Sequence, residues 1–367
     1  MLPYTENIIQ KPSEYTYFKF SQKTQERIYE DEQNRILIDE ESLPSTAFFT
    51  FFNSQNVVNS VNFSDDGHLI SVGCSDSSIR LYDFKKTQVV NGMNPQAKLL
   101  GHCGPVFSTN NSPDFKWLVS GSEDCSVRLW SLDYPSCIMS FNEHDGPVWD
   151  VQYCPLEYYM LSSSYDKTAR LWTSKQNKSV RIFGGDGGHS EDVTCSVFTP
   201  DALMVITGSA DKTIKIWDVG KGKKMADLTG HDASITSLAI SSTGRYLASG
   251  DEKGSVILWD IKYGEHVKKI KMLKTSNQPI ISMAFSNAVS KERCDDIILV
   301  TCCNENYISL WNIQEALHET ESKHKLAMNS ADNYLIKQYN TKDTPVIDVQ
   351  FTRRNLLLAA GIYNSPE

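Results

Sequence analysis

Short runs of alternating apolar and polar residues recur along most of the chain. One clear instance has runs at 193–198, 204–208 and 214–217, with Thr199-Pro200-Asp201 and Ala210-Asp211-Lys212-Thr213 between them. Runs of about four to eight residues that are bounded by Pro, Asp or Gly are typical of short sheet strands. The pattern therefore predicts a chain made mainly of β-strands.

The strand pattern repeats with a period of about 40 residues. Four histidines each stand 28 residues before a tryptophan, and successive tryptophans are 42, 45 and 42 residues apart: His102 and Trp130, His144 and Trp172, His189 and Trp217, His231 and Trp259. A fixed offset inside such a period is typical of WD repeats, each of which supplies one blade of a β-propeller. We predict an all-β, seven-bladed propeller over residues 41–367, preceded by a short, partly helical extension over residues 1–40.

The first and sixth repeats depart from this pattern. The first has Ser54 at the histidine position and Tyr82 in place of the tryptophan. The sixth ends at Trp311, but it has no histidine and carries an insertion at 287–296. We therefore expect both blades to form with incomplete sets of these residues.

The last repeat supplies only an inner strand at 345–351 and a second strand at 355–361. A sheet edge left open would expose unpaired backbone groups. We therefore expect the N-terminal segment 47–52 (AFFTFF) to complete this blade, with 35–39 (RILID) as a candidate for one more strand. The polar segment 21–34 predicts a surface helix.

Alignment of the repeats reveals a recurring set of a histidine, a hydroxyl, an aspartate and a tryptophan. The sets are His102, Ser120, Asp124 and Trp130; His144, Ser162, Asp166 and Trp172; His189, Thr207, Asp211 and Trp217; and His231, Ser249 and Trp259, with Lys253 at the aspartate position. The same residue types make nucleophilic triads, but a catalytic site occurs once in a chain and this set recurs. We interpret each set as a structural chain of hydrogen bonds, each worth about 1 kcal/mol. We predict no enzymatic activity, no metal and no cofactor.

Composition narrows the class of partner. The net charge is −9, whereas binding to the phosphate backbone normally uses a basic face, so direct sequence-specific DNA binding is not expected. No apolar run approaches the ~20 residues of a membrane span, and residues 1–10 lack the pattern of a signal peptide. The nine cysteines are scattered without a C-x-x-C pair, which favours reduced thiols in an intracellular protein.

Three local motifs favour a structural interpretation. The glycine-rich segment 184–188 is not followed by the Gly-Lys-Ser/Thr of a phosphate-binding loop, so we expect an interblade loop. Cys302 and Cys303 are neighbours on a predicted strand, so their side chains should point to opposite faces rather than to one metal. Four lysines between 268 and 274 are expected on an outer strand of blade 5, as a solvated edge or as a contact for an acidic partner.

The turns between the first and second strands of several blades offer candidate partner contacts on one side of the propeller. Trp, Tyr and Arg are the residues that most often anchor protein interfaces. The candidates are Phe115, Trp117, Tyr158, Tyr159, Arg353 and Arg354. The alternative is that an aromatic residue at the start of a second strand only covers the sheet edge, as Tyr246 would in blade 5.

The two ends of the chain and one turn of the first blade are more specific. Residues 43–53 read LPSTAFFTFFN, 73–80 read GCSDSSIR, 343–346 read DTPV and 351–361 read FTRRNLLLAAG. Together these segments resemble the WD-repeat domain of TBP-associated factor five. That family supplies subunits of the general transcription factor TFIID and, in fungi, of the SAGA coactivator. The resemblance covers roughly residues 40–365.

The resemblance implies a non-enzymatic scaffold in the nucleus. It implies docking of the histone-fold pair formed by TBP-associated factors six and nine, contact with other TFIID or SAGA subunits, and folding assisted by the ring chaperonin CCT. The family has helical N-terminal domains, including a LisH motif, which residues 1–40 are too short to hold. Self-association through those domains is therefore not implied.

Two other classes of binding protein fit the propeller. Substrate receptors of cullin ubiquitin ligases often carry Trp-Asp-x-Arg after the third strand of a blade, but Gly220 and Lys262 stand at the arginine position here. A histone-tail reader would need an aromatic cage at the central pore to hold a methylated lysine.

Overall fold

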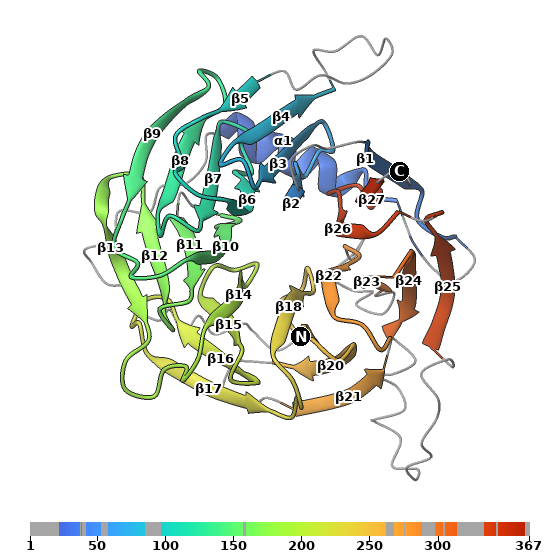
Figure 1. The fold of residues 1–367 in the computed structure, drawn as a ribbon. Helices are drawn as coiled ribbons and strands as arrows, with labels where there is room; N and C mark the ends of the chain where they lie inside the picture. The colour runs from blue at the N-terminus through green and yellow to red at the C-terminus, as the bar shows by residue number, and fades with distance from the viewer. Residues whose placement is uncertain are drawn as a thin grey trace.

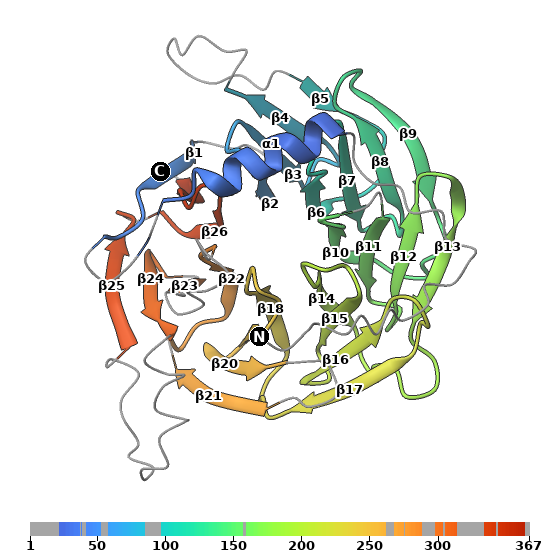
Figure 2. The same ribbon diagram turned by 180° about the vertical axis from the view of Figure 1, so that it is seen from behind.

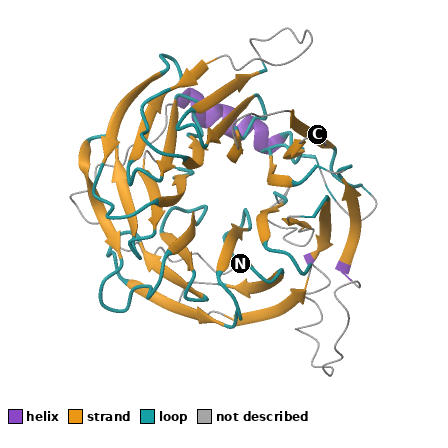
Figure 3. Cartoon of the chain, viewed as in Figure 1, coloured by secondary structure: helices purple, strands orange, loops and turns teal. Residues whose placement is uncertain are grey.

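The computed structural model describes residues 22–36, 38, 42–52, 58–84, 97–156, 159–261, 268–274, 276–287, 298–303, 305–313, 334–342 and 344–363. In this part of the chain, seven sheets stand as blades around a common centre (Figure 1). Strands account for nearly all of the regular structure (Figure 3). The predicted seven-bladed propeller is confirmed.

Blades 1 to 6 each contain four strands, which follow one another outwards in sequence order and pair antiparallel. Blade 1 has β2 (Val58–Phe63), β3 (Leu69–Cys74), β4 (Ile79–Asp83) and β5 (Ala97–Leu99). Blade 2 has β6 (Val106–Asn111), β7 (Trp117–Ser122), β8 (Val127–Ser131) and β9 (Ser136–Phe141). Blade 3 has β10 (Val148–Tyr153), β11 (Tyr159–Ser164), β12 (Ala169–Thr173) and β13 (Gln176–Phe183).

The second half of the ring continues this order. Blade 4 has β14 (Val193–Phe198), β15 (Met204–Ser209), β16 (Thr213–Asp218) and β17 (Lys224–Thr229). Blade 5 has β18 (Ile235–Ile240), β19 (Tyr246–Asp251), β20 (Ser255–Asp260) and β21 (Lys268–Lys274). Blade 6 has β22 (Ile280–Phe285), β23 (Ile298–Cys303), β24 (Tyr307–Asn312) and β25 (Leu335–Asn340).

Blade 7 is made from both ends of the sequence. It has β26 (Val346–Phe351), β27 (Leu357–Tyr363) and then β1 (Thr46–Phe52). β1 pairs parallel with β27, from Thr46 opposite Leu357 to Phe52 opposite Tyr363. In the other blades, the fourth strand runs parallel to the second strand but is separated from it by the third. β1 has the direction of such a fourth strand, but it pairs directly with β27, the second strand of blade 7. The predicted closure by residues 47–52 is confirmed.

The candidate strand over residues 35–39 is wrong for the residues that the structure describes. Arg35, Ile36 and Ile38 lie outside any strand. Ile38 is instead buried, 3% exposed, among side chains of blades 6 and 7. An isolated apolar contact therefore replaces a further strand, and β1 is the N-terminal strand observed in blade 7.

The core is divided among the interfaces between neighbouring blades. Each of seven apolar clusters lies between two adjacent blades, and the one between blades 5 and 6 joins Tyr246 and Leu258 to Phe285 and Trp311. Burial of one such side chain contributes about 1.5–3 kcal/mol. The ring is therefore held by side chains that each pair of blades shares.

Cys302 and Cys303 show how the strand period builds these clusters. Cys302 packs in the cluster with blade 7 and Cys303 in the cluster with blade 5. The two side chains thus point to opposite faces of blade 6, as predicted. The other local predictions also hold: residues 184–188 form the loop between β13 and β14, and the lysine run lies on the outer strand β21.

The predicted N-terminal helix is α1 (Gln22–Gln33). It lies across one face of the ring, over blades 7, 1 and 2 (Figure 2). Several residues of the sequence predictions lie outside the described residues: Ser54, Tyr158, Lys262, 288–296 and the helix start at Ser21.

Candidate functional site

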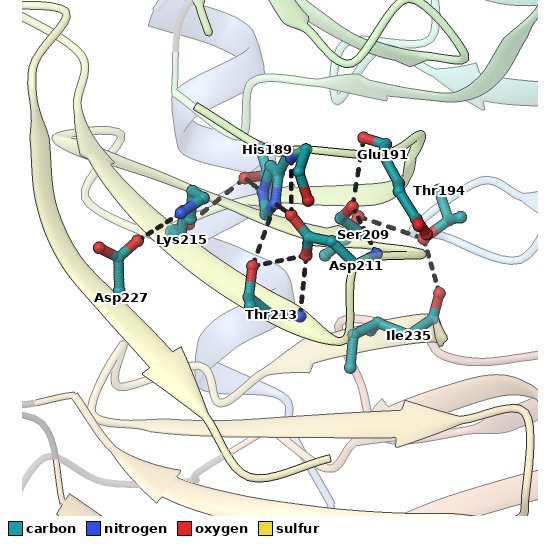
Figure 4. A network of polar contacts seen from close by, with 12 residues as sticks. His189, Glu191, Thr194, Ser209, Asp211, Thr213, Lys215, Asp227 and Ile235 are labelled. Atoms are coloured by element: carbon teal, nitrogen blue, oxygen red, sulfur yellow. Dashed lines mark hydrogen bonds and ion pairs between the residues drawn. The ribbon is translucent and has the colours of Figure 1, made fainter. Parts of the chain in front are cut away.

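The tetrad of blade 4 forms a continuous chain of hydrogen bonds. Figure 4 shows the part of this network in which Asp211 meets His189 and Thr213. His189 Nδ1 lies 3.0 Å from Asp211 Oδ2, and His189 Nε2 lies 2.8 Å from Thr207 Oγ1. The indole Nε1–H of Trp217 donates to the same hydroxyl at 2.9 Å. With its proton on Nδ1, the imidazole donates to the Asp211 carboxylate and accepts from the Thr207 hydroxyl at Nε2. Both ring nitrogens of His189 therefore have a hydrogen-bond partner.

The same chain recurs in the other three blades that have a histidine. His102, His144 and His231 lie 2.6–2.7 Å from their hydroxyls through Nε2, and each tryptophan donates to that hydroxyl at 2.8 Å. In blades 2 and 3 the His Nδ1–Asp Oδ2 distances are 2.9 and 2.7 Å. The four histidine side chains are at most 1% exposed.

The aspartates also anchor the backbone around them. Asp211 accepts from the backbone N–H groups of Ser190 and Thr213, and from the Thr213 hydroxyl at 2.6 Å. Each carboxylate therefore holds the loop before the inner strand and the turn before the third strand in one arrangement. This anchoring role is common to the four blades that have a tetrad and requires no substrate.

The hydrogen bonds determine the electrostatics of the tetrads. Burial alone would raise the pKa of Asp211, but the hydrogen bonds from His189, Thr213 and Ser190 outweigh burial and hold that pKa below its usual value. Asp124, Asp166 and Asp251 also have lowered pKa values, because the hydrogen bonds from their histidines and backbone N–H groups outweigh the effect of burial. The carboxylates are thus stabilised as anions, which fits the structural interpretation.

Blade 5 corrects one sequence prediction. Its tetrad is complete, because Asp251 and not a residue at position 253 pairs with His231, at 3.0 Å. Asp251 occupies the position of Ser209 in blade 4, where the serine hydroxyl accepts from the backbone N–H of Asp211. The signal for it was an aspartate two residues before the expected position, which a fixed-offset alignment misses.

Blades 1 and 6 have partial networks. In blade 6, Trp311 Nε1 donates to Thr301 Oγ1 at 2.9 Å, so the hydroxyl–indole bond persists where the sequence has no histidine. In blade 1, Asp76 lies 3.4 Å from Arg80 and 3.2 Å from Lys98. No group of His, Cys, Asp and Glu with metal-binding geometry occurs among the described residues.

A second polar cluster joins α1 to the propeller. Arg353 lies in the turn between β26 and β27. Its Nη2 lies 2.6 Å from Asp65 Oδ2 and donates to the Pro113 carbonyl at 3.1 Å. Its Nη1 lies 4.0 Å from Oδ2 of Asp31 in α1. Its neighbour Arg354 lies 2.8 Å from Asp31. Arg353 therefore connects α1 with blades 1, 2 and 7.

Phe115 belongs to the same cluster. The guanidinium groups of Arg27 and Arg353 lie 5.4 and 5.7 Å from the centre of its ring. Three of the candidate partner contacts, Phe115, Arg353 and Arg354, are thus engaged with α1 or the residues around it.

Trp117 and Tyr159 stand at the first positions of β7 and β11 and are half-buried. Trp117 packs against the cluster between blades 2 and 3, and Tyr159 against the cluster between blades 3 and 4. Tyr246, the matching residue of β19, is 7% exposed beneath the Arg245 guanidinium. The edge-covering interpretation therefore applies in full to Tyr246 and in part to Trp117 and Tyr159, which keep accessible surface.

Comparisons with known proteins agree with this geometry. The family model for the WD domain, G-beta repeat, matches residues 93–131, 135–173 and 177–218. Models for the Anaphase-promoting complex subunit 4 WD40 domain and the Vps8 beta-propeller match residues 45–110 and 227–302. The small ribosomal subunit protein RACK1y of Oryza sativa is 32% identical, over 69% of this chain and 76% of that protein. The chain belongs to the WD-repeat family of β-propellers.

Two further relatives narrow this class. Transcription initiation factor TFIID subunit 5 of Caenorhabditis elegans is 31% identical over 89% of this chain. The SAGA complex/transcription factor TFIID complex subunit Taf5 of Schizosaccharomyces pombe is 39% identical over 27% of this chain. The chain is a WD40 propeller related to TFIID subunit 5. The match covers 53% of the length of the C. elegans relative and 17% of the length of the S. pombe relative.

The described residues bear on two predictions from composition. Cys74, Cys103, Cys125, Cys137, Cys154, Cys195, Cys302 and Cys303 are free thiols, while Cys294 lies outside the described residues. In the part of the chain that the structure describes, no helix is long and apolar enough to cross a membrane.

Proposed function

We propose that the chain is a non-enzymatic scaffold of an RNA polymerase II transcription complex of the TFIID or SAGA type, acting in the nucleus at transcription initiation. The observation that carries this proposal is the 31% identity to TFIID subunit 5 over 89% of the chain. The tetrads support it, because they recur in four blades and serve to hold loops in place. A ring whose polar networks repeat from blade to blade and hold loops in place is suited to binding other proteins.

The partners proposed are the histone-fold TBP-associated factors six and nine. The surface proposed for them is the rim of blades 2 and 3, where Trp117 and Tyr159 begin their second strands and the exposed Lys116 precedes Trp117. Phe115, Arg353 and Arg354 contribute indirectly, since they fix α1 beside this rim. CCT is the chaperonin expected to assist folding of the ring.

Binding of the purified chain to a recombinant pair of the two histone-fold factors tests this assignment. The Trp117→Ala/Tyr159→Ala variant should bind at least about tenfold more weakly, as loss of an interface anchor implies. Lys116→Glu tests the same rim without removing packing. Tyr165→Ala is the matched control, because Tyr165 is 55% exposed in the turn between β11 and β12, at the opposite end of β11 from Tyr159. Unchanged binding of both rim variants would exclude this surface.

A substrate receptor of a cullin ubiquitin ligase is the competing class. Gly220 and Lys262 stand where such receptors often have arginine. Co-purification with a cullin adaptor in place of histone-fold factors would favour that class.

A further inference from the structure

The inner strands enclose a central cavity of about 440 Å³. In every blade a bulge follows the first residue of the inner strand, as between Val148 and Asp150 of β10. A bulge re-aims side chains, and here the second, third and fifth residues of most inner strands are partly exposed and line the cavity. The cavity wall is therefore built of rings of equivalent residues.

These rings are not symmetric. At the third position, four blades have serine and blade 4 has Cys195, whereas blades 3 and 7 have Asp150 and Asp348. At the fifth position, blades 7, 1, 2 and 3 have amides and blades 4 to 6 have small apolar residues. The fifth-position ring is thus polar over blades 7, 1, 2 and 3 and apolar over blades 4 to 6, so the wall differs from side to side, as in a site that receives its ligand in one orientation.

Within the part of the chain that the structure describes, neither of the two carboxylates has a cation beside it. Asp150 accepts from Ser108 Oγ and from the backbone N–H of Ser196, both at 3.0 Å, and Asp348 accepts from Ser282 Oγ at 2.6 Å. No ion pair with Lys or Arg involves either one within the described residues. Burial raises the pKa of Asp150 to about 6 and, together with the charge of Asp150, that of Asp348 to about 7. A carboxylate confined in a cavity without a compensating cation is costly, so a cation would be stabilised here.

The same wall has polar atoms without partners. Within the described residues, Trp149 Nε1, Ser60 Oγ and Ser196 Oγ are buried and make no hydrogen bond, although all three residues line the cavity. Ser196 is only 3% exposed. Trp149 also packs on Phe107, with 5.0 Å between ring centres. A ligand with a hydrogen-bond acceptor and a cationic group would therefore complement this wall. The acceptor would satisfy the Trp149 indole N–H, and the cation would be attracted by the two carboxylates and by the π-faces of Phe107 and Trp149.

We propose that the central cavity binds a basic side chain of an extended peptide segment from a partner protein. Its cationic group lies beside Asp150 and against the Phe107–Trp149 pair, and a peptide carbonyl accepts the Trp149 indole N–H. A polyamine has the cation but no carbonyl acceptor. A trimethylated lysine is favoured less, since a cage needs aromatic walls on several sides and the lining has two aromatic residues.

The test uses the purified full chain and two synthetic probes. One is a capped Gly-Ala-Arg-Ala-Gly peptide, and the other has citrulline, an uncharged isostere, in place of arginine. Binding is followed by the indole N–H resonance of Trp149 in a ¹H–¹⁵N spectrum, assigned by its loss in Trp149→Phe. We expect the arginine peptide to shift this resonance and the citrulline peptide to bind about tenfold or more weakly, as loss of a desolvated cation contact implies.

Variants locate the cation. Asp150→Asn should weaken binding of the arginine peptide by a factor on the order of ten, and Asp348→Asn tests the opposite wall. Asp186→Asn is the matched control. It removes the same charge, but Asp186 is exposed in the loop between β13 and β14. A thermal unfolding curve of each variant confirms that it is folded.

Three results would overturn the proposal: no shift with the arginine peptide up to its solubility limit, equal binding of the two peptides, or full binding by folded Asp150→Asn. Since purified protein and synthetic peptides are used, these results leave the proposed scaffold role untouched.

Discussion

Asp251 accepts a hydrogen bond from His231 across 20 residues of sequence, whereas the aspartates of the other tetrads lie 22 residues after their histidines. In blades 2 to 4 the aspartate faces the histidine and accepts from the backbone of the turn, and a serine two residues earlier accepts from the backbone N–H of that aspartate. In blade 5, Asp251 Oδ1 accepts from the backbone N–H groups of Lys253 and Ser255, while Oδ2 faces His231. Asp251 therefore stands at the serine position yet serves both the histidine and the turn, and Lys253 contributes its backbone N–H to this network.

This arrangement predicts opposite outcomes for two neighbouring substitutions. Asp251 is fully buried, so Asp251→Ala leaves a histidine and two backbone N–H groups unpaired and should lower the free energy of unfolding by about 2–4 kcal/mol. Lys253→Ala, the matched control, should change it by less than about 0.5 kcal/mol. Urea denaturation monitored by circular dichroism measures both. A larger effect at position 253 would contradict the assignment.

The tetrads predict loss of stability in acid. Their aspartates have pKa values below the usual value, so their contribution is complete above about pH 4 and is lost as the pH falls towards the folded-state values. The urea midpoint should therefore fall between about pH 5 and about pH 3. Asp211→Asn should show a smaller fall than the unmodified chain, because one of these groups no longer titrates. Equal falls would show that Asp211 is not stabilised as an anion.

The cavity carboxylates predict the opposite pH dependence. Burial raises the pKa of Asp348 to about 7, and Asp150 across the cavity adds to this, so ionisation of Asp348 costs stability as the pH rises from about 4 to about 7. Asp348→Asn removes this cost while Ser282 still has an oxygen to bond. It should stabilise the unliganded chain at about pH 8 by about 1–2 kcal/mol, allowing for screening in the open cavity, and have little effect near pH 4. An equal effect at both pH values would indicate a change in packing instead.

Two adjacent arginines provide a test of how α1 is attached. The Arg353 side chain is 12% exposed and joins three blades and α1, whereas that of Arg354 is 58% exposed and contacts α1 through Asp31. Arg353→Ala should cost about 2 kcal/mol or more because it leaves Asp65 and a carbonyl unpaired, and Arg354→Ala about 0–1 kcal/mol, as for an exposed ion pair. Limited proteolysis of α1 should accelerate in the first variant far more than in the second. Similar acceleration in both would contradict the assignment of Arg353 as the main attachment of α1.

Much of the architecture could be predicted from sequence because it repeats. The 28-residue offset from histidine to tryptophan identified the blades, and the boundaries of β14, β15 and β16 agree with the predicted strands to within about one residue. The closure by β1 followed from the need to pair the edge of β27. Both predictions rest on backbone pairing and strand period, which are local or repeated properties.

The errors have a different origin. The role of Asp251 depends on a carboxylate that reaches its histidine from another position, and offsets in the other blades do not reveal it. The engagement of Arg353 and Phe115 by α1 joins residues hundreds of positions apart, with no periodicity to report it. The asymmetry of the cavity appears only after the bulges show which residues of each inner strand point inwards.

The central claim is that this propeller is a scaffold within a TFIID-type or SAGA-type complex. Affinity purification of the tagged chain from nuclear extract, followed by mass spectrometry of the proteins that co-elute, tests it most directly. We predict recovery of histone-fold TBP-associated factors in amounts comparable to the tagged chain, and subunits specific to SAGA would show which complex it serves. Recovery of a cullin adaptor, or of nucleosomes without those factors, would contradict the claim.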